Sequence, residues 1–356
     1  MALREGKRPR KLIVDARGEF IAPPTEAMWE AMKSADYGWP LLGEDVNVNQ
    51  LEEMGAEMTG KEAALLVPTT SVANLLGMMG YAQRGDVAIM EARCHLWWVE
   101  ERNIAHHTGA VPRLIRGNKF GEMSLEDIEG TIMESGYSYR PRTSLICLEN
   151  THNICGGTAL SPRYMTQVAE LAHKHGAVVL VDGARLFNAA IAHNVPLSDL
   201  AGPVDVVSIS LNKGIGAPYG AMVCGTKDFI EQAGKNQRVL GCHSVHKEGI
   251  FAAAAIVGLK TMIDRLIEDH IMARRLAELI ASLPGLEVDM ETVQTNIVRI
   301  ETMSIDPFIL VQRVFDRGVG MSVLDQKAVK MVTHRKISDK DIEFAVKVIE
   351  EALALN

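Results

Sequence analysis

Short apolar runs alternate with amphipathic stretches through the middle of the chain. Two of the amphipathic stretches, residues 72–83 and 164–175, carry apolar side chains at helical spacing. The apolar runs between them are too short for helices and are typical of strands buried on both faces. This alternation predicts an α/β domain with a parallel sheet. The runs predicted as strands are residues 63–67, 86–90, 144–148, 177–181 and 204–211.

The pattern changes after about residue 255. Residues 256–283 have the periodicity of one long helix, and residues 339–355 that of a final amphipathic helix. Short strand candidates lie between them, at residues 286–288 and 296–300. We therefore predict two domains. Residues 46–254 form the large one, and residues 1–45 together with 255–356 form the small one.

Composition limits the class of protein. The chain has 356 residues, 47% of them hydrophobic and 23% charged, which is typical of a globular protein with a sizeable core. A net charge of −8 argues against nucleic-acid binding. The longest apolar stretch, residues 250–259, is about half as long as a membrane span requires, so no membrane partner is expected. The basic residues 4–11 precede no apolar segment and are interpreted as a solvated tail, not a secretory signal.

The five cysteines are odd in number and form no C-x-x-C pair. This indicates reduced thiols in a cytoplasmic protein, with neither a disulfide framework nor a zinc site. No metal site is expected elsewhere.

Two glycine-rich segments imitate nucleotide-binding motifs. The segment G-A-E-M-T-G-K at 55–61 resembles a P-loop, but Glu62 replaces the required Ser or Thr and no strand precedes it. The glycines between Gly214 and Gly220 half resemble a dinucleotide fingerprint, but Pro218 opposes the helix that must begin there. We therefore expect a nucleotide at neither segment, and we interpret the glycines from 214 to 220 as a tight turn of the backbone beside Lys213.

Asp182 and Lys213 are the most informative pair. Asp182 ends the apolar run 177–181, and Lys213 closely follows the run 204–211. A carboxylate at one strand end and a lysine just past another match the needs of pyridoxal 5′-phosphate. The lysine forms an imine with the aldehyde, and the carboxylate keeps the ring nitrogen protonated so that the ring accepts electrons.

Further residues support this interpretation. Thr70 and Ser71 open the predicted helix 72–83, where free N–H groups and hydroxyls suit a phosphate, although an ordinary helix cap is the alternative. Arg185 stands three residues after Asp182, and its guanidinium suits the carboxylate of an amino acid. The alternative for Arg185 is a surface loop residue.

Two histidines follow predicted strands. His95 lies in E-A-R-C-H-L-W-W at 91–98, where its imidazole suits stacking on a pyridine ring and carrying a proton. A packing role beside the two tryptophans is the alternative. His152 lies at a strand end, where the sites of α/β proteins gather.

On these residues the sequence resembles the threonine aldolases of the β-eliminating lyase family. The resemblance covers nearly the whole chain and implies the aspartate-aminotransferase fold: a large domain with a mixed, mostly parallel seven-stranded sheet, and a small α+β domain. The most specific matching segments are E-N-T-H-N at 149–153, D-G-A-R-L-F-N at 182–188, K-G-I-G-A-P at 213–218 and V-T-H at 332–334.

The resemblance also implies roles. Lys213 holds the cofactor, Asp182 faces the ring nitrogen, and Arg185 contacts cofactor and substrate carboxylate. His95 stacks on the ring, and His152 lies near the substrate hydroxyl. The family cleaves the Cα–Cβ bond of a β-hydroxy-α-amino acid into glycine and an aldehyde.

Several departures from the family affect the substrate pocket. The opening L-R-S-D-T reads A-R-G-E-F at 16–20, which removes a serine but keeps Arg17 as a candidate substrate contact. The phosphate loop S-G-T-M-G-N reads T-T-S-V-A-N at 69–74. Lys330 stands where the family has a second carboxylate-binding arginine, and it offers a point charge without a fork. The family's glycine-rich segment that reaches a neighbouring subunit's cofactor corresponds to residues 241–247, and the candidate replacements are Lys247, His246 and the nearby Arg238.

The first hypothesis is therefore a pyridoxal-phosphate-dependent aldehyde-lyase of amino-acid metabolism. Alternatives are a β-eliminating lyase or aminotransferase acting on another amino acid, and a non-catalytic protein that holds the cofactor. The resemblance also implies a homo-oligomer, a dimer or a homotetramer, with the site at a subunit interface.

Overall fold

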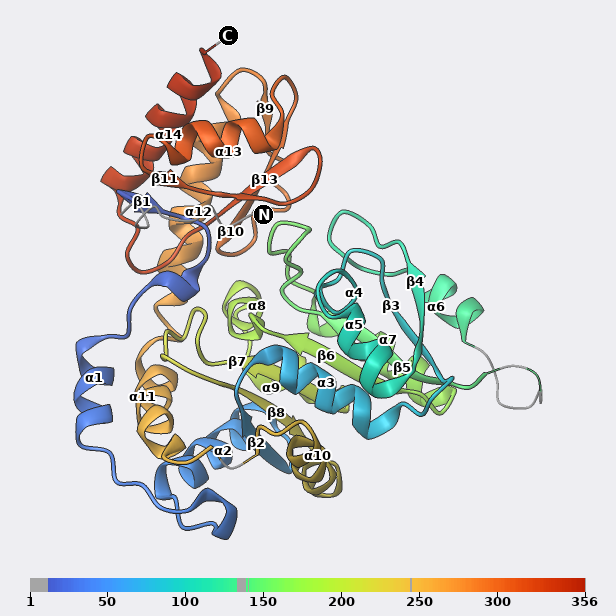
Figure 1. Ribbon diagram of the computed structural model, residues 1–356. Coiled ribbons are helices and arrows are strands. Elements are labelled where there is room, and N and C mark those ends of the chain that lie inside the picture. Colours follow the sequence, from blue (N-terminus) through green and yellow to red (C-terminus); the bar gives the residue numbers. More distant parts are fainter. Residues whose placement is uncertain (1–11, 133–138, 140, 244, 356) are drawn as a thin grey trace. The chain divides into compact units, whose positions relative to one another are not determined.

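The computed structural model describes residues 12–132, 139, 141–243 and 245–355 (Figure 1). The basic segment 4–11 lies outside the described residues. By their contacts, the described residues form two compact units. The large unit comprises residues 23–267, and the small unit comprises the segments 12–22 and 268–355.

The large unit contains a seven-stranded sheet in the order β2-β8-β7-β6-β5-β3-β4. All neighbouring strands are parallel except β8, which runs antiparallel to both β2 and β7. This confirms the predicted mixed, mostly parallel sheet, and each of the five predicted strands is present. The strands are β2 (Ala63–Val67), β3 (Val87–Glu91), β4 (Val111–Ile115), β5 (Thr143–Glu149), β6 (Val178–Gly183), β7 (Val206–Ser210) and β8 (Ala221–Gly225).

Helices cover both faces of this sheet, as continuous apolar strands require. Along β5, Ile146 and Leu148 pack into one apolar core, and Leu145 and Cys147 pack into another. The first core includes side chains from α2, α7, α8 and α11, and the second includes side chains from α3 and α10. The helices of the large unit are α1 (Glu26–Lys33), α2 (Val46–Thr59), α3 (Thr70–Tyr81), α4 (His95–Trp98), α5 (Glu101–Asn103), α6 (Leu125–Thr131), α7 (Pro162–Lys174), α8 (Leu186–His193), α9 (Leu197–Ala201), α10 (Lys227–Val239) and α11 (Glu248–Thr261), with shorter turns η2 (Pro40–Leu42) and η3 (Ile104–Thr108).

The predicted single helix over residues 256–283 is wrong. The structure has α11, which ends at Thr261, and α12 (Leu266–Ala281), with a turn between them. Leu259 packs into the core of the large unit, whereas Ala277 packs into the core of the small unit. The two helices thus pack into different cores, and hydrophobic periodicity does not record that change of packing partner.

The division into units also differs from the predicted domains at two segments. Residues 23–45 and 255–267 belong by their contacts to the large unit. The reason is that α1 packs on α11, where Met28 meets Ala254 and Met262, and α11 in turn packs on α2.

The small unit has a four-stranded antiparallel sheet in the order β12-β13-β10-β9 and a parallel pair of β1 with β11. His334 and Val332 join the two parts, because the ring Nε2 of His334 lies 2.9 Å from the carbonyl of Asp15 and the Val332 N–H donates to Ala16. Its elements are β1 (Val14–Asp15), η1 (Glu19–Ile21), α12, β9 (Leu286–Glu287), β10 (Ile297–Thr302), α13 (Pro307–Phe315), β11 (Val319–Gly320), β12 (Ser322–Val323), β13 (Ala328–Val332) and α14 (Asp339–Leu353).

The first misleading glycine segment has an ordinary structural role. Gly55 lies inside α2, and Gly60 ends that helix in the left-handed conformation at φ 65°. The segment therefore forms no phosphate-binding loop. Among the helices of the described residues, none is both long and apolar enough to cross a membrane.

Candidate active site

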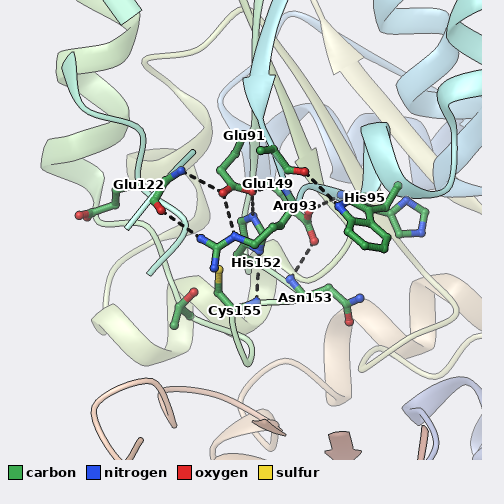
Figure 2. A network of polar contacts seen from close by, with 12 residues as sticks. Glu91, Arg93, His95, Glu122, Glu149, His152, Asn153 and Cys155 are labelled. Atoms are coloured by element: carbon green, nitrogen blue, oxygen red, sulfur yellow. Dashed lines mark hydrogen bonds and ion pairs between the residues drawn. The ribbon is translucent and has the colours of Figure 1, made fainter. Parts of the chain in front are cut away.

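Polar side chains gather where the parallel strands of the large sheet end. Glu91 is the last residue of β3, Glu149 the last of β5, and Asp182 the last but one of β6. Parallel strands bring their carboxyl ends to one edge of a sheet, which is where α/β proteins bind ligands. All three carboxylates are at most 5% exposed. Figure 2 shows the polar network that Glu91 and Glu149 form at this edge.

Glu149 connects the two histidine-bearing loops. One carboxylate oxygen accepts the backbone N–H of His95 at 2.6 Å, and the other accepts the N–H of Asn153 at 2.8 Å (Figure 2). Both bonds are charge-assisted, and the carboxylate that accepts them is only 5% exposed, which makes them stronger than neutral hydrogen bonds at the surface. Glu149 therefore connects the loops that follow β3 and β5 to one another.

His152 lies deep in this network, with 1% of its surface exposed. Its ring Nε2 lies 3.1 Å from a carboxylate oxygen of Glu91, and its Nδ1 accepts the N–H of Cys155 at 3.4 Å. Burial lowers the pKa of His152. The charge of Glu149 and the hydrogen bonds with Cys155 and Glu91 raise it by more, so the net shift is upward.

Arg93 supports Glu91 from the other side. Its Nε donates to Glu91 at 3.0 Å, and its terminal nitrogen donates to the carbonyl of Asn118 at 2.7 Å. Burial alone raises the pKa of Glu91, but His152 and Arg93 together lower it to about 2. Glu91 is therefore a carboxylate held between the His152 ring and the Arg93 guanidinium. Sequence reasoning missed both Glu91 and Arg93, although the position of Glu91 directly after an apolar run was a usable signal.

His95 opens α4 and faces acidic groups. Its Nδ1 lies 2.8 Å from a carboxylate oxygen of Glu100 and 3.9 Å from one of Asp182. Burial lowers the pKa of His95, but the hydrogen bond with Glu100 and the charges of Asp182 and Glu149 raise it overall. The imidazole is thus placed to hold a proton beside the predicted ring-nitrogen partner.

Asp182, Arg185 and Lys213 all belong to this end of the sheet. The Asp182 carboxylate is 2% exposed and accepts the N–H of Ala184 at 3.2 Å. Arg185 directly precedes α8 and is only 7% exposed, so it is not a surface loop residue. Lys213 lies in the turn after β7, where its carbonyl accepts the N–H of Gly216.

The predicted phosphate end is the start of α3. Thr69 caps the helix by accepting the N–H of Val72 at 3.2 Å, and Thr70 is the first helical residue. The Ser71 hydroxyl donates to Glu100 at 2.9 Å. The helix follows β2, which runs parallel to β7, so its N-terminus lies at the same sheet edge as Asp182.

The other predicted residues belong to other elements of the chain. Lys247 is exposed and precedes α11 in the left-handed conformation, at φ 66°. Arg17 and Lys330 belong to the small unit. Arg17 is exposed and its Nε donates to Asp15 at 2.7 Å, and Lys330 on β13 lies opposite Arg299 of β10. Their roles stay predictions.

Residues 17–303 match the sequence pattern of the beta-eliminating lyase family. The chain is 35% identical over 345 residues to low-specificity L-threonine aldolase 1 of Arabidopsis thaliana, covering 96% of both chains. It is 31% identical over 330 residues to the low specificity L-threonine aldolase of Escherichia coli K12, covering 93% of this chain and 96% of that one. The chain belongs to the beta-eliminating lyase family, as a threonine aldolase-like member.

Solved structures agree on the fold. A putative L-allo-threonine aldolase of Listeria monocytogenes EGD-E aligns with a TM-score of 0.78 at 20% identity, covering 96% of this chain and 97% of that one. An aspartate aminotransferase of Rhizobium meliloti aligns with a TM-score of 0.72 at 16% identity, covering 96% and 91%. The fold is that of the pyridoxal-phosphate enzymes of fold type I, as predicted.

The residues at the sheet edge fit the cofactor that this family uses. A buried carboxylate at Asp182, a lysine amine at 213 and the N-terminus of a 12-residue helix supply the acid, the amine and the anion-binding groups it requires. Gly183 allows the tight approach of β6 to β7, because a Cβ there would lie 2.4 Å from the Ser208 carbonyl oxygen.

Proposed function

We propose that this protein binds pyridoxal 5′-phosphate and cleaves the Cα–Cβ bond of a β-hydroxy-α-amino acid, releasing glycine and an aldehyde. The observation that carries the proposal is the buried Asp182 carboxylate at the end of β6, beside His95 and in a chain related to threonine aldolases. A water-shielded acid at that point suits a cofactor with a protonated ring nitrogen.

In this proposal each candidate site residue of the large unit has one role in binding the cofactor. Lys213 holds it covalently through its Nζ, and Asp182 faces the ring nitrogen. Thr70 and Ser71, at the start of α3, face the phosphate, and Lys247 of a neighbouring subunit adds a positive charge. When bound, the cofactor supplies an electron sink for the pair of electrons left on Cα.

The substrate is held by its carboxylate. Arg185 is the main candidate, because its guanidinium presents a planar, two-pronged set of donors. Arg17 and Lys330 are the further candidates. The orientation of the substrate carboxylate determines which bond of Cα is weakened. The residues that bind this carboxylate therefore also decide the type of reaction.

The proton of the substrate hydroxyl passes to His95 or His152, directly or through a water molecule. The His95 side chain is 30% exposed and the His152 side chain 1% exposed. His95 is therefore the more accessible of the two, while the hydrogen bonds of His152 hold its ring in one orientation.

The proposal is tested by incubating the purified protein with threonine, allo-threonine, phenylserine, serine and a cysteine conjugate, and identifying the products. We expect glycine and an aldehyde from the first three. Pyruvate with ammonia would instead indicate β-elimination, and a requirement for a keto acid would indicate transamination. Lys213→Ala should abolish both turnover and the visible absorbance of the bound cofactor, whereas Lys235→Ala, on the exposed face of α10, should change neither.

We also propose that the chain forms a homo-oligomer in the cytoplasm. Exposed apolar side chains on the large unit support self-association: Tyr37, Trp39, Leu41, Leu42 and Val46. All five cysteines are free thiols, which suits a reducing compartment. Light scattering on the purified protein distinguishes a monomer from a dimer or tetramer, and a monomer would contradict the first part of this proposal.

A further inference from the structure

Glu100 is a buried acid without a signal in the sequence. It lies between α4 and α5 and is 3% exposed. One of its carboxylate oxygens receives three groups: the His95 ring Nδ1 at 2.8 Å, the Ser71 hydroxyl at 2.9 Å and the Asn74 amide nitrogen at 3.3 Å. A buried carboxylate is costly unless it is hydrogen-bonded, and these three contacts stabilise it.

The contact with His95 determines how that ring is presented. A carboxylate at Nδ1 orients the imidazole and holds a proton on that nitrogen, which leaves Nε2 as the nitrogen available to another group. A ring nitrogen of His95, a carboxylate oxygen of Glu100 and a carboxylate oxygen of Asp182 all lie within 4.8 Å of one another. The ring is thus surrounded by negative charge from Glu100, Asp182 and Glu149, which favours its protonated form.

The contact with Ser71 extends the set to α3. A hydroxyl has a single hydrogen, so while the Ser71 hydroxyl donates to Glu100 it is the backbone N–H of Ser71, in the first turn of α3, that faces the phosphate in the proposed function. Asn74, one turn further along α3, bonds both Glu100 and the Ser208 hydroxyl of β7, at 3.3 and 2.5 Å. Ser208 is the register partner of Asp182. Glu100 therefore lies at the centre of a group of interacting polar side chains from α3, α4, β6 and β7.

We propose that Glu100 is a positioning residue for the reaction: it fixes the orientation of His95 through Nδ1 and couples the histidine to the start of α3 through Ser71. This inference rests on the proposed function, because it takes His95 as the group that faces the cofactor ring. Glu100 itself touches neither substrate nor cofactor in this account and acts through the other two residues.

The test compares Glu100→Gln and Glu100→Ala with wild type and with Glu101→Gln, an exposed acid next to it in the chain. Glutamine keeps the shape and an oxygen acceptor but removes the charge, whereas alanine removes both. The titration of His95 is followed by NMR in the cofactor-loaded protein with 13C-labelled histidine, and the signal is assigned with His95→Asn. Turnover and KM are measured on the same samples.

We expect Glu100→Gln to lower the pKa of His95 by about one unit or more, since an adjacent opposite charge shifts a pKa by roughly 1–3 units. Turnover should fall roughly tenfold in Glu100→Ala and less in Glu100→Gln, with KM changed little. Glu101→Gln should match wild type in all three measurements.

An unchanged His95 titration in the folded Glu100→Gln variant would overturn the inference, as would full turnover in both variants. The two proposals fail separately. If no amino acid is cleaved by wild type, the proposed function fails, but a shifted His95 titration would still establish that Glu100 controls the state of that ring.

Discussion

The carboxylate of Glu149 lies 2.6 Å from the backbone nitrogen of His95, 54 residues earlier in the chain. Its second oxygen holds Asn153, next to the other candidate histidine. A side chain that ends one strand therefore sets the backbone position of the loop that follows the neighbouring strand. Neither histidine is positioned by its own loop alone.

Glu149→Ala should destabilise the protein by about 3 kcal/mol, because it leaves two partly buried N–H groups without the carboxylate that accepts them. The free energy of unfolding in urea measures this loss. Glu129→Ala is a suitable control, because that acid is exposed and its described partners are Lys174 and His175 on α7 and at its end. Equal stability of the two variants would show that the two hydrogen bonds accepted by Glu149 contribute nothing to the free energy of unfolding.

Glu91 should make the protein acid-sensitive. Its pKa falls from 4.5 to about 2 in the folded state, so its stabilising contribution is complete above about pH 4.5 and is lost as the pH falls toward 2. Glu91→Gln should be less stable at pH 7 and should show a shallower loss of stability between these two pH values. Urea unfolding at a series of pH values checks the slope, and identical slopes would contradict the assignment.

Asp182→Asn should lower turnover about a hundredfold or more while loosening the cofactor much less, because an amide cannot stabilise a protonated ring nitrogen. Turnover is measured with the substrate found in the amino-acid panel, and cofactor affinity by absorbance titration. A variant with wild-type turnover would reject the role of Asp182.

Lys330→Arg should lower KM for the amino acid several-fold, because an arginine restores a forked pair of donors to the carboxylate. Lys327→Arg, at an exposed position close by in the same unit, serves as the control. Steady-state kinetics of both variants and of wild type give KM and kcat, and we expect KM to change in Lys330→Arg while kcat stays the same. An unaltered KM would remove Lys330 from the substrate-binding residues.

Five of the seven strands of the large sheet were predicted from sequence, and β4 and β8 were missed. A strand buried on both faces must be a continuous apolar run, and the change to a polar residue marks its end. Asp182 follows this rule, and so do Glu91 and Glu149. The family motifs around residues 149–153 and 213–218 added the cofactor and the type of reaction.

The sequence alone determined the fold class, the positions along the chain at which the predicted strands end, and the polar residues at those positions. These features depend on local apolar patterns and short motifs. Only the tertiary structure decided which groups meet. Glu100 lies in a polar stretch like many others, and folding buries it against Ser71 and His95. The break between α11 and α12 was likewise decided by two separate cores. Contacts between distant segments depend on how strands and helices pack, and no local pattern encodes them.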